Sequence, residues 1–188
     1  MSFGSTPTRG RLLVAGPPLE DPNFRRTVVF MIEHNDDGAL GVVLNRPSPI
    51  DIADALPQWV DLAAAPPAVF IGGPVEQGSV LGLGRLVDDA APEGLTPVHA
   101  GIGVLDLEAD PVRLQGDVGG VRLFTGYAGW GPGQLEAELA MGGWFVVDAE
   151  PSDVTTTAPD DLWRAVLRRQ PDDDLALLAL FPDDLSAN

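Results

Sequence analysis

The segment 27–45 constrains the fold more than any other part of the chain. Residues 27–34 read TVVFMIEH, and apolar side chains occupy both alternating sets of positions. A strand that is apolar on both faces is typical of a central strand that is covered on both sides. The turn sequence Asn35-Asp36-Asp37-Gly38 follows, and residues 39–45 (ALGVVLN) return as a second apolar run. Because a Gly-containing turn between two such runs favours a hairpin, we predict a β-hairpin here.

Other runs predict further elements. We expect strands at 11–15, 68–71, 79–87, 98–107, 121–127 and 144–148, and helices at 52–59, 132–141 and 159–170. The helices at 132–141 and 159–170 are the better marked. The last one opens with Pro and two Asp and ends with Arg168-Arg169, which suits the helix dipole. Its predicted buried stripe is Leu162, Trp163, Val166 and Leu167. Hairpin-linked strands that precede the better-marked helices indicate an α+β fold.

A length of 188 residues suggests one domain. We find neither an internal repeat nor a linker, and we expect a flexible N-terminus over 1–10, a single domain over 11–181 and a frayed tail over 182–188. The longest uncharged stretch, residues 62–75, is shorter than the roughly 18 residues of a membrane span. With no signal-peptide pattern either, we expect a cytoplasmic protein.

Three residue counts limit the chemistry of the chain. Cys is absent, which excludes disulfides, thiol nucleophiles and Cys-based metal sites. Lys is also absent, which excludes Schiff bases and a P-loop lysine. The chain has two His residues, His34 and His99, which are too few for a His-rich metal centre. We therefore expect no cofactor, no metal site and no complete catalytic constellation.

The formal net charge is −17. A protein that binds a phosphate backbone normally carries a basic patch, and the 11 basic residues here are spread out. Direct nucleic-acid binding and binding to anionic membrane surfaces are therefore disfavoured.

Arginines close to the predicted hairpin form the first candidate site. Asp21 and Pro22 suit the start of one helical turn, and Arg25-Arg26 follow. The two guanidinium groups either clamp a phosphate or carboxylate or form ion pairs with nearby acids, for which Glu20, Asp21 and Glu33 are the candidates. Antiparallel pairing would also return Asn45-Arg46 towards residues 25–27.

His34 is the second candidate. Adjacent strand residues point to opposite faces, so Glu33 and His34 enter one site only if the strand bulges or ends there. His34 acts either as a general base or ligand, or it closes the turn through a backbone hydrogen bond.

Two Gly-rich runs are the third candidate. They are Gly72-Gly73-Pro74 and residues 126–136, GYAGWGPGQLE. The second run predicts a strand, a turn and a helix start, whose N–H groups either bind an anion or serve only the architecture. Tyr127 and Trp130 either line a ligand pocket or belong to the core, and Gln134 lies in the first turn of the predicted helix.

Taken together, several runs resemble the YqgE/AlgH family of bacterial proteins, in its actinobacterial branch. The resemblance covers about residues 11–181 and rests on the segments 18–28, 33–35, 38–47, 72–74 and 126–136, with 56–59 and 161–171 as branch features. It implies a single α+β domain whose bent sheet closes into a pseudo-barrel with helices outside. The family name carries a link to transcriptional control of alginate synthesis, but the resemblance implies no established reaction and no catalytic residue.

Two functions follow as hypotheses. The first is a non-enzymatic regulatory or interaction module with a protein partner. The alternative is a binder of, or enzyme acting on, a small anionic metabolite. The candidate site residues for such a ligand are Arg25, Arg26, His34, Asn45, Arg46, Gly72, Gly73, Tyr127, Trp130 and Gln134.

Overall fold

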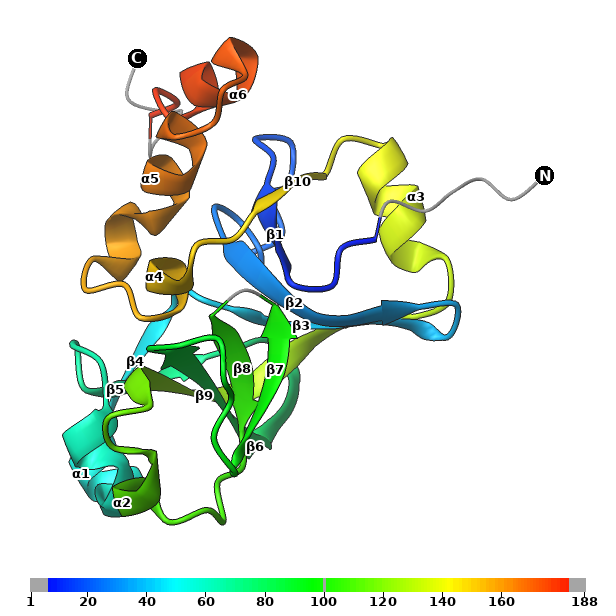
Figure 1. Ribbon diagram of the computed structural model, residues 1–188. Coiled ribbons are helices and arrows are strands. Elements are labelled where there is room, and N and C mark those ends of the chain that lie inside the picture. The colour runs from blue at the N-terminus through cyan, green and yellow to red at the C-terminus, as the bar shows by residue number, and fades with distance from the viewer. Residues whose placement is uncertain (1–6, 100, 183–188) are drawn as a thin grey trace.

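The strands form a curled sheet around which the chain is built (Figure 1). The computed structural model describes residues 7–99 and 101–182. The strands are β1 (Arg11–Ala15), β2 (Val28–Asn35), β3 (Gly38–Val43), β4 (Pro47–Asp51), β5 (Ala68–Ile71), β6 (Val75–Leu86), β7 (Leu95–His99), β8 (Ile102–Leu105), β9 (Val118–Trp130) and β10 (Trp144–Asp148). Their order is β10-β1-β2-β3-β9-β6-β8-β7, while β4 pairs with β5 and β5 pairs with β9. The sheet is antiparallel except between β5 and β9.

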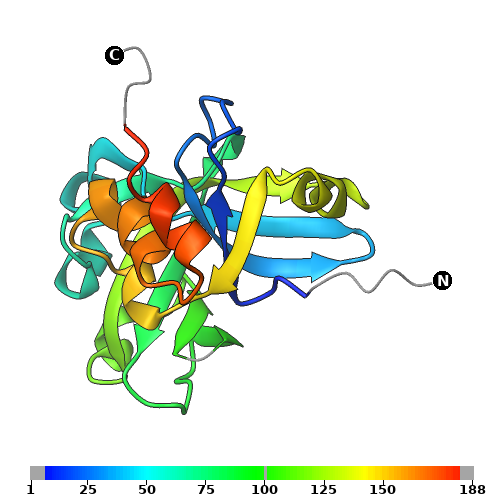
Figure 2. The ribbon, with the colours of Figure 1, turned by 90° about the horizontal axis from the view of Figure 1, so that it is seen from above.

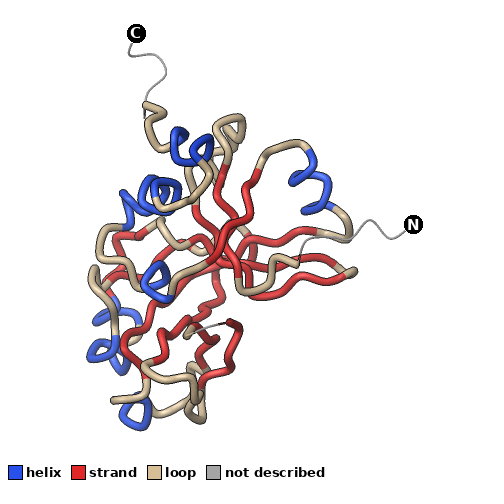
Figure 3. The backbone as a smooth tube through the Cα atoms, turned by 45° about the horizontal axis from the view of Figure 1, so that its top comes forward, coloured by secondary structure: helices blue, strands red, loops and turns tan. Residues whose placement is uncertain are grey.

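Short helices surround this sheet, as Figure 3 shows. The α-helices are α1 (Ile52–Ala55), α2 (Pro111–Leu114), α3 (Gln134–Ala140), α4 (Pro151–Val154), α5 (Leu162–Arg168) and α6 (Asp173–Leu178), and the 3-10 helices are η1 (Pro57–Leu62) and η2 (Pro159–Asp161). Helices α5 and α6 lie side by side (Figure 2). The predicted α+β fold is confirmed, with the antiparallel sheet curled into a half-barrel.

The predicted hairpin is present as β2 and β3, and β2 is buried on both faces. Val28 and Phe30 lie in the core cluster that also contains Trp163 of α5. Val29 and Met31 lie in a second cluster, on the side of α3. Both sets of residues are apolar because each set packs against a different layer of the protein, as predicted.

Two predicted elements differ from the structure. The strand expected over 98–107 is two strands, β7 and β8, which run antiparallel with His99 opposite Ile102. Gly101, at φ +79°, permits this reversal. The helix expected over 52–59 ends at Ala55, because Pro57 disfavours helical geometry at the residue before it. Asp51 does cap it, accepting a hydrogen bond from the N–H of Ala53 at 2.8 Å.

Strand β4 and helices α2, α4 and α6 were not predicted. Each is only four to six residues long. Elements of this length leave too few residues to show a hydrophobic period, so their sequences look like loops.

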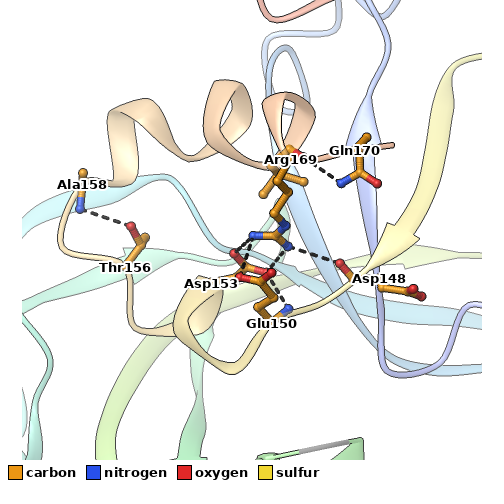
Figure 4. A network of polar contacts seen from close by, with 8 residues as sticks. Asp148, Glu150, Asp153, Thr156, Ala158, Arg169 and Gln170 are labelled. Atoms are coloured by element: carbon orange, nitrogen blue, oxygen red, sulfur yellow. Dashed lines mark hydrogen bonds and ion pairs between the residues drawn. The ribbon is translucent and has the colours of Figure 1, made fainter. Parts of the chain in front are cut away.

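A buried ion pair joins β10, α4 and α5 (Figure 4). The two Nη atoms of Arg169 each lie 2.6 Å from an oxygen of Asp153, and the Asp153 side chain is only 3% exposed. Asp153 also accepts the N–H of Glu150, and Arg169 also donates to the carbonyl of Asp148. The hydrogen bonds that Arg169 donates to Asp153 raise the pKa of Arg169. This network therefore fixes the path from the last strand into the C-terminal helices.

Some expectations concern residues at the two ends of the chain. Residues 1–6 of the predicted flexible N-terminus, and residues 183–188 of the predicted tail, lie outside the described residues. Among the described residues, the helices are all too short or too polar to cross a membrane.

Candidate functional site

Asn45 lies at the base of the hairpin, two residues after the end of β3. Its side-chain oxygen accepts the N–H of Val28 at 3.0 Å, and its Nδ2 donates to the carbonyl of Arg26 at 2.9 Å. Arg26 has a left-handed backbone, at φ 54°, which is uncommon for a residue with a side chain. The side-chain oxygen and nitrogen of Asn45 thus both bind the backbone that enters β2. These hydrogen bonds stabilise the left-handed conformation of Arg26.

Arg46 lies beside the turn 21–26, as the hairpin geometry predicts. Its Nη1 donates to the carbonyl of Pro22 at 3.2 Å, and its Nη2 donates to the carbonyl of Arg25 at 2.8 Å. Burial lowers the pKa of Arg46. The side chain therefore closes the turn by satisfying backbone carbonyls rather than by pairing with a carboxylate.

Arg26 contacts the C-terminal part of the chain. Its guanidinium carbon lies 4.7 Å from the centre of the Trp163 ring, and its Nη2 donates to the carbonyls of Phe181 and Pro182. Trp163 in turn donates from its indole N–H to the carbonyl of Ala15 at 2.9 Å. Arg26 thus connects the turn before β2 to the residues that follow α6.

The first Gly-rich run is needed for close packing of backbones. A Cβ at Gly72 would lie 2.4 Å from the carbonyl oxygen of Gly126, and one at Gly73 would lie 2.2 Å from that of Tyr127. No side chain fits at such distances. The run lets the segment between β5 and β6 lie directly against β9.

A small cavity of about 180 Å³ lies where Arg46 and Gly73 meet. Its lining residues are Asn23, Val43, Arg46, Ile71, Gly73, Pro74 and Gln77. Of the ten candidate ligand residues, only these two share this cavity.

His34 lies on the α3 side of the hairpin and is almost fully buried. Its Nε2 is 2.7 Å from Oε1 of Glu136, and its Nδ1 is 2.8 Å from the hydroxyl of Thr8. A neutral imidazole satisfies both contacts, with Nε2–H donating to the carboxylate and the Thr8 hydroxyl donating to Nδ1. Of the two alternatives for His34, the backbone hydrogen bond is wrong, because the side chains of Thr8 and Glu136 are its partners.

The Thr8–His34–Glu136 series has the order hydroxyl, imidazole, carboxylate that many hydrolases use. A nucleophile, however, must reach a substrate carbonyl. Thr8 has an exposed fraction of 0%. The series therefore links three segments of the structure rather than presenting a nucleophile.

The second Gly-rich run contributes to an indole cluster on the same side. The N–H groups of Trp130 and Trp144 both donate to Oε2 of Glu138, at 2.8 and 2.9 Å. Gln134 donates to Oε1 of Glu138 at 3.3 Å and accepts the N–H of Gly131 at 3.1 Å. Glu138 and Gln134 therefore connect α3 to Trp130, Trp144 and the turn before the helix.

The hairpin also borders an open groove, on the side to which Glu33 points. A β-bulge between Met31 and Glu33 shifts the register of β2, and Glu33 and His34 lie on opposite faces. Glu33 lies at the edge of an open groove of about 400 Å³, which we call the hairpin groove. Its lining residues are Glu33, Asn35, Asp37, Gly38, Ala39, Leu40, Val75, Tyr127, Gly129 and Trp130.

The candidate residues are thus divided among separate places. Tyr127 lines the hairpin groove, and Trp130 borders it while its indole contacts Glu138 of α3. Arg46 and Gly73 line the small cavity, and His34 and Gln134 contact side chains of α3. Sequence reasoning missed Thr8, because its partner His34 lies 26 residues away in the chain. The one sequence signal for the contacts of α3 was the pair of acids at its start, since Glu136 and Glu138 are close in sequence to two aromatic residues.

The contact between His34 and Glu136 predicts a dependence of stability on pH. The backbone N–H of Glu136 and then the hydrogen bond with His34 lower the pKa of this carboxyl from its usual 4.5. The stabilisation is therefore present above about pH 4.5 and is lost as the pH falls through the lower, folded-state pKa. In urea unfolding, the loss of stability of Glu136→Gln relative to the wild type should be larger at pH 7 than at pH 3. A difference that persists undiminished at pH 3 would contradict this role.

Comparisons with known proteins agree with this architecture. The family model described as AlgH-like (DUF179) matches residues 12–174. The UPF0301 protein SCO2948 of Streptomyces coelicolor is 55% identical over 183 residues, which cover 95% of this chain and 94% of the relative. A UPF0301 protein of Mycobacterium tuberculosis is 50% identical, over 95% of this chain and 90% of its own.

Two solved structures share the fold. Protein DIP2367 of Corynebacterium diphtheriae superposes with a TM-score of 0.89 at 39% identity and 94% coverage of both chains. The AlgH protein of Pseudomonas aeruginosa superposes with a TM-score of 0.66 at 28% identity, covering 96% of this chain and 98% of its own. The chain belongs to the AlgH-like family.

Proposed function

We propose that this protein is a non-enzymatic interaction module with a regulatory role, and that the hairpin groove is its binding surface for a protein partner. The observation that carries this proposal is the composition of the groove. Leu40, Val75 and Tyr127 supply apolar surface, while the carboxylates of Glu33 and Asp37 make no hydrogen bond or ion pair within the described residues. An apolar floor with polar groups at its margin is the usual composition of a protein interface.

The position of the groove also supports a binding role. It is built on strands β2, β3, β6 and β9, whose backbones are held by the sheet. A rigid surface loses little conformational freedom when a partner binds, so more of the contact energy appears as affinity.

An anionic metabolite is the weaker alternative. Both Nη atoms of Arg46 already donate to backbone carbonyls, and Nη2 of Arg26 does the same. An anion in the small cavity would compete with contacts that close the N-terminal turn.

Filling the groove tests the proposal without changing the charge of the protein. A Cβ at Gly129 would lie 3.5 Å from the Tyr127 ring and 4.0 Å from Val75, which are ordinary contacts. We expect that the tagged wild-type protein, mildly crosslinked in its native bacterial cytoplasm, retains one partner in near-equal amount, and that Gly129→Val loses it. The readout is quantitative mass spectrometry of the captured complex.

A second glycine variant provides the matched control. A Cβ at Gly78 would meet no atom within 4 Å, so Gly78→Val adds the same side chain outside the groove. It should capture the partner as the wild type does. Capture of no partner in stoichiometric amount, or equal capture by Gly129→Val, would overturn the proposed function.

A further inference from the structure

The charges around the hairpin groove indicate which kind of partner it accepts. Glu33 and Asp37 are both exposed, and Asn35 adds an amide between them. The lining residues include no Arg and no His. An incoming cation would therefore meet two carboxylates and no like charge, whereas an incoming anion would be repelled.

The floor of the groove favours a cation with a flat apolar surface. Gly129 leaves a space between the Tyr127 ring and Val75, since a Cβ there would touch both. Tyr127 is half-buried and borders this space. A cation over an aromatic face is attracted by the ring, and a guanidinium group can stack on the ring while its N–H groups reach carboxylates.

We infer that the hairpin groove binds a basic segment of a protein partner, with an arginine side chain placed against Tyr127 and between the carboxylates of Glu33 and Asp37. This inference rests on the proposed function and names the chemistry of the partner. Leu40 and Val75 provide contacts for apolar side chains next to the arginine. A small inorganic cation would leave these apolar groups unused.

The charge of the whole chain favours the same partner. The formal net charge is −17, so the long-range field attracts a basic segment and increases its association rate. Such a field acts over the entire surface, however, and would attract a basic peptide to any acidic region. The test must therefore separate the groove from the diffuse field.

The probe is a labelled hexa-arginine peptide with blocked ends, and the readout is fluorescence anisotropy at 0.15 M salt. Removing both groove charges in Glu33→Gln/Asp37→Asn should weaken binding about tenfold, which corresponds to about 1.4 kcal/mol. Gly129→Val, which keeps every charge, should weaken binding by a similar factor because it occupies the space beside Tyr127. Hexa-lysine should bind less tightly than hexa-arginine, since an ammonium group cannot stack or bind in a bidentate manner.

Asp88→Asn/Asp89→Asn is the control for net charge. Both residues are exposed in the loop after β6 and outside the groove, and the double variant removes the same two charges. Its affinity for hexa-arginine should stay within twofold of the wild type. An equal loss in this control, or no effect of Gly129→Val, would overturn the inference. Spermine that binds with the same sensitivity to the variants, and better than the peptide, would also overturn it, because the occupant would then be a polyamine.

The two proposals fail in different ways. If the partner is captured and Gly129→Val loses it, but hexa-arginine does not bind, the groove is an interface for a partner of other chemistry. If Gly129→Val keeps the partner, the groove is not the interface and the proposed function itself is wrong.

Discussion

Replacing Arg169 with Ala should lower the free energy of unfolding by about 3 kcal/mol, because it leaves the buried carboxylate of Asp153 without its cation. Asp153 is 3% exposed and receives both Nη atoms at 2.6 Å. The value lies at the lower end of the range for broken buried pairs, since the Arg169 side chain is itself 25% exposed. Urea-induced unfolding followed by circular dichroism measures the change.

The neighbouring residue supplies the control for this prediction. Arg168 forms its ion pair with Asp161 at 3.9 Å, with both side chains 56% exposed. Exposed pairs contribute up to about 1 kcal/mol, so Arg168→Ala should change stability by less than that. Arg169→Lys should recover only part of the loss, because an ammonium group cannot make the two parallel hydrogen bonds. Equal effects of Arg168→Ala and Arg169→Ala would contradict the role of the buried pair.

Replacing Trp163 with Ala should lower the free energy of unfolding by about 4 kcal/mol, a typical cost of removing a large buried aromatic side chain. Trp163 is buried in the core cluster that joins α5 to β1 and β2. Its indole N–H donates to Ala15, and Arg26 stacks on its ring. The substitution therefore removes packing, a hydrogen bond and a cation–π contact at one place. Differential scanning calorimetry and urea unfolding both measure the effect.

A second variant divides these contributions. Trp163→Phe keeps an aromatic ring but removes the N–H, and leaves the buried carbonyl of Ala15 without that donor. It should cost about 1 to 2 kcal/mol, from the lost hydrogen bond and the smaller side chain. A cost for Trp163→Ala that does not exceed the cost for Trp163→Phe would show that packing of the ring contributes little.

Local patterns in the sequence predicted the elements that local physics decides. The hairpin of β2 and β3 follows from two apolar runs around a short polar turn, and the buried stripe of α5 follows from its helical spacing. The proximity of Arg46 to the turn 21–26 also followed, since antiparallel pairing determines it. In each case the interacting residues are close in sequence or joined by one hairpin.

The candidate site followed from sequence only in part. The sequence left open whether Tyr127 and Trp130 line a pocket or belong to the core. Tyr127 borders the hairpin groove, and Trp130 borders it while being buried in the core cluster on the side of α3. The arginines were picked for their affinity for anions, yet Arg26 and Arg46 donate to backbone carbonyls. A guanidinium group donates to either kind of acceptor, and the sequence does not show which acceptor lies within reach.

Tertiary structure alone decided the remaining features. The bulge between Met31 and Glu33 sends Glu33 into the groove and His34 towards α3, and no residue pattern marks it. Thr8 and Glu136 meet on His34 across more than 100 residues of chain between them. By itself the sequence determined the acidic charge, the hairpin and the α+β class, because these depend on composition and on neighbours along the chain. The groove depended on the fold, because its walls come from strands that only the curled sheet brings together.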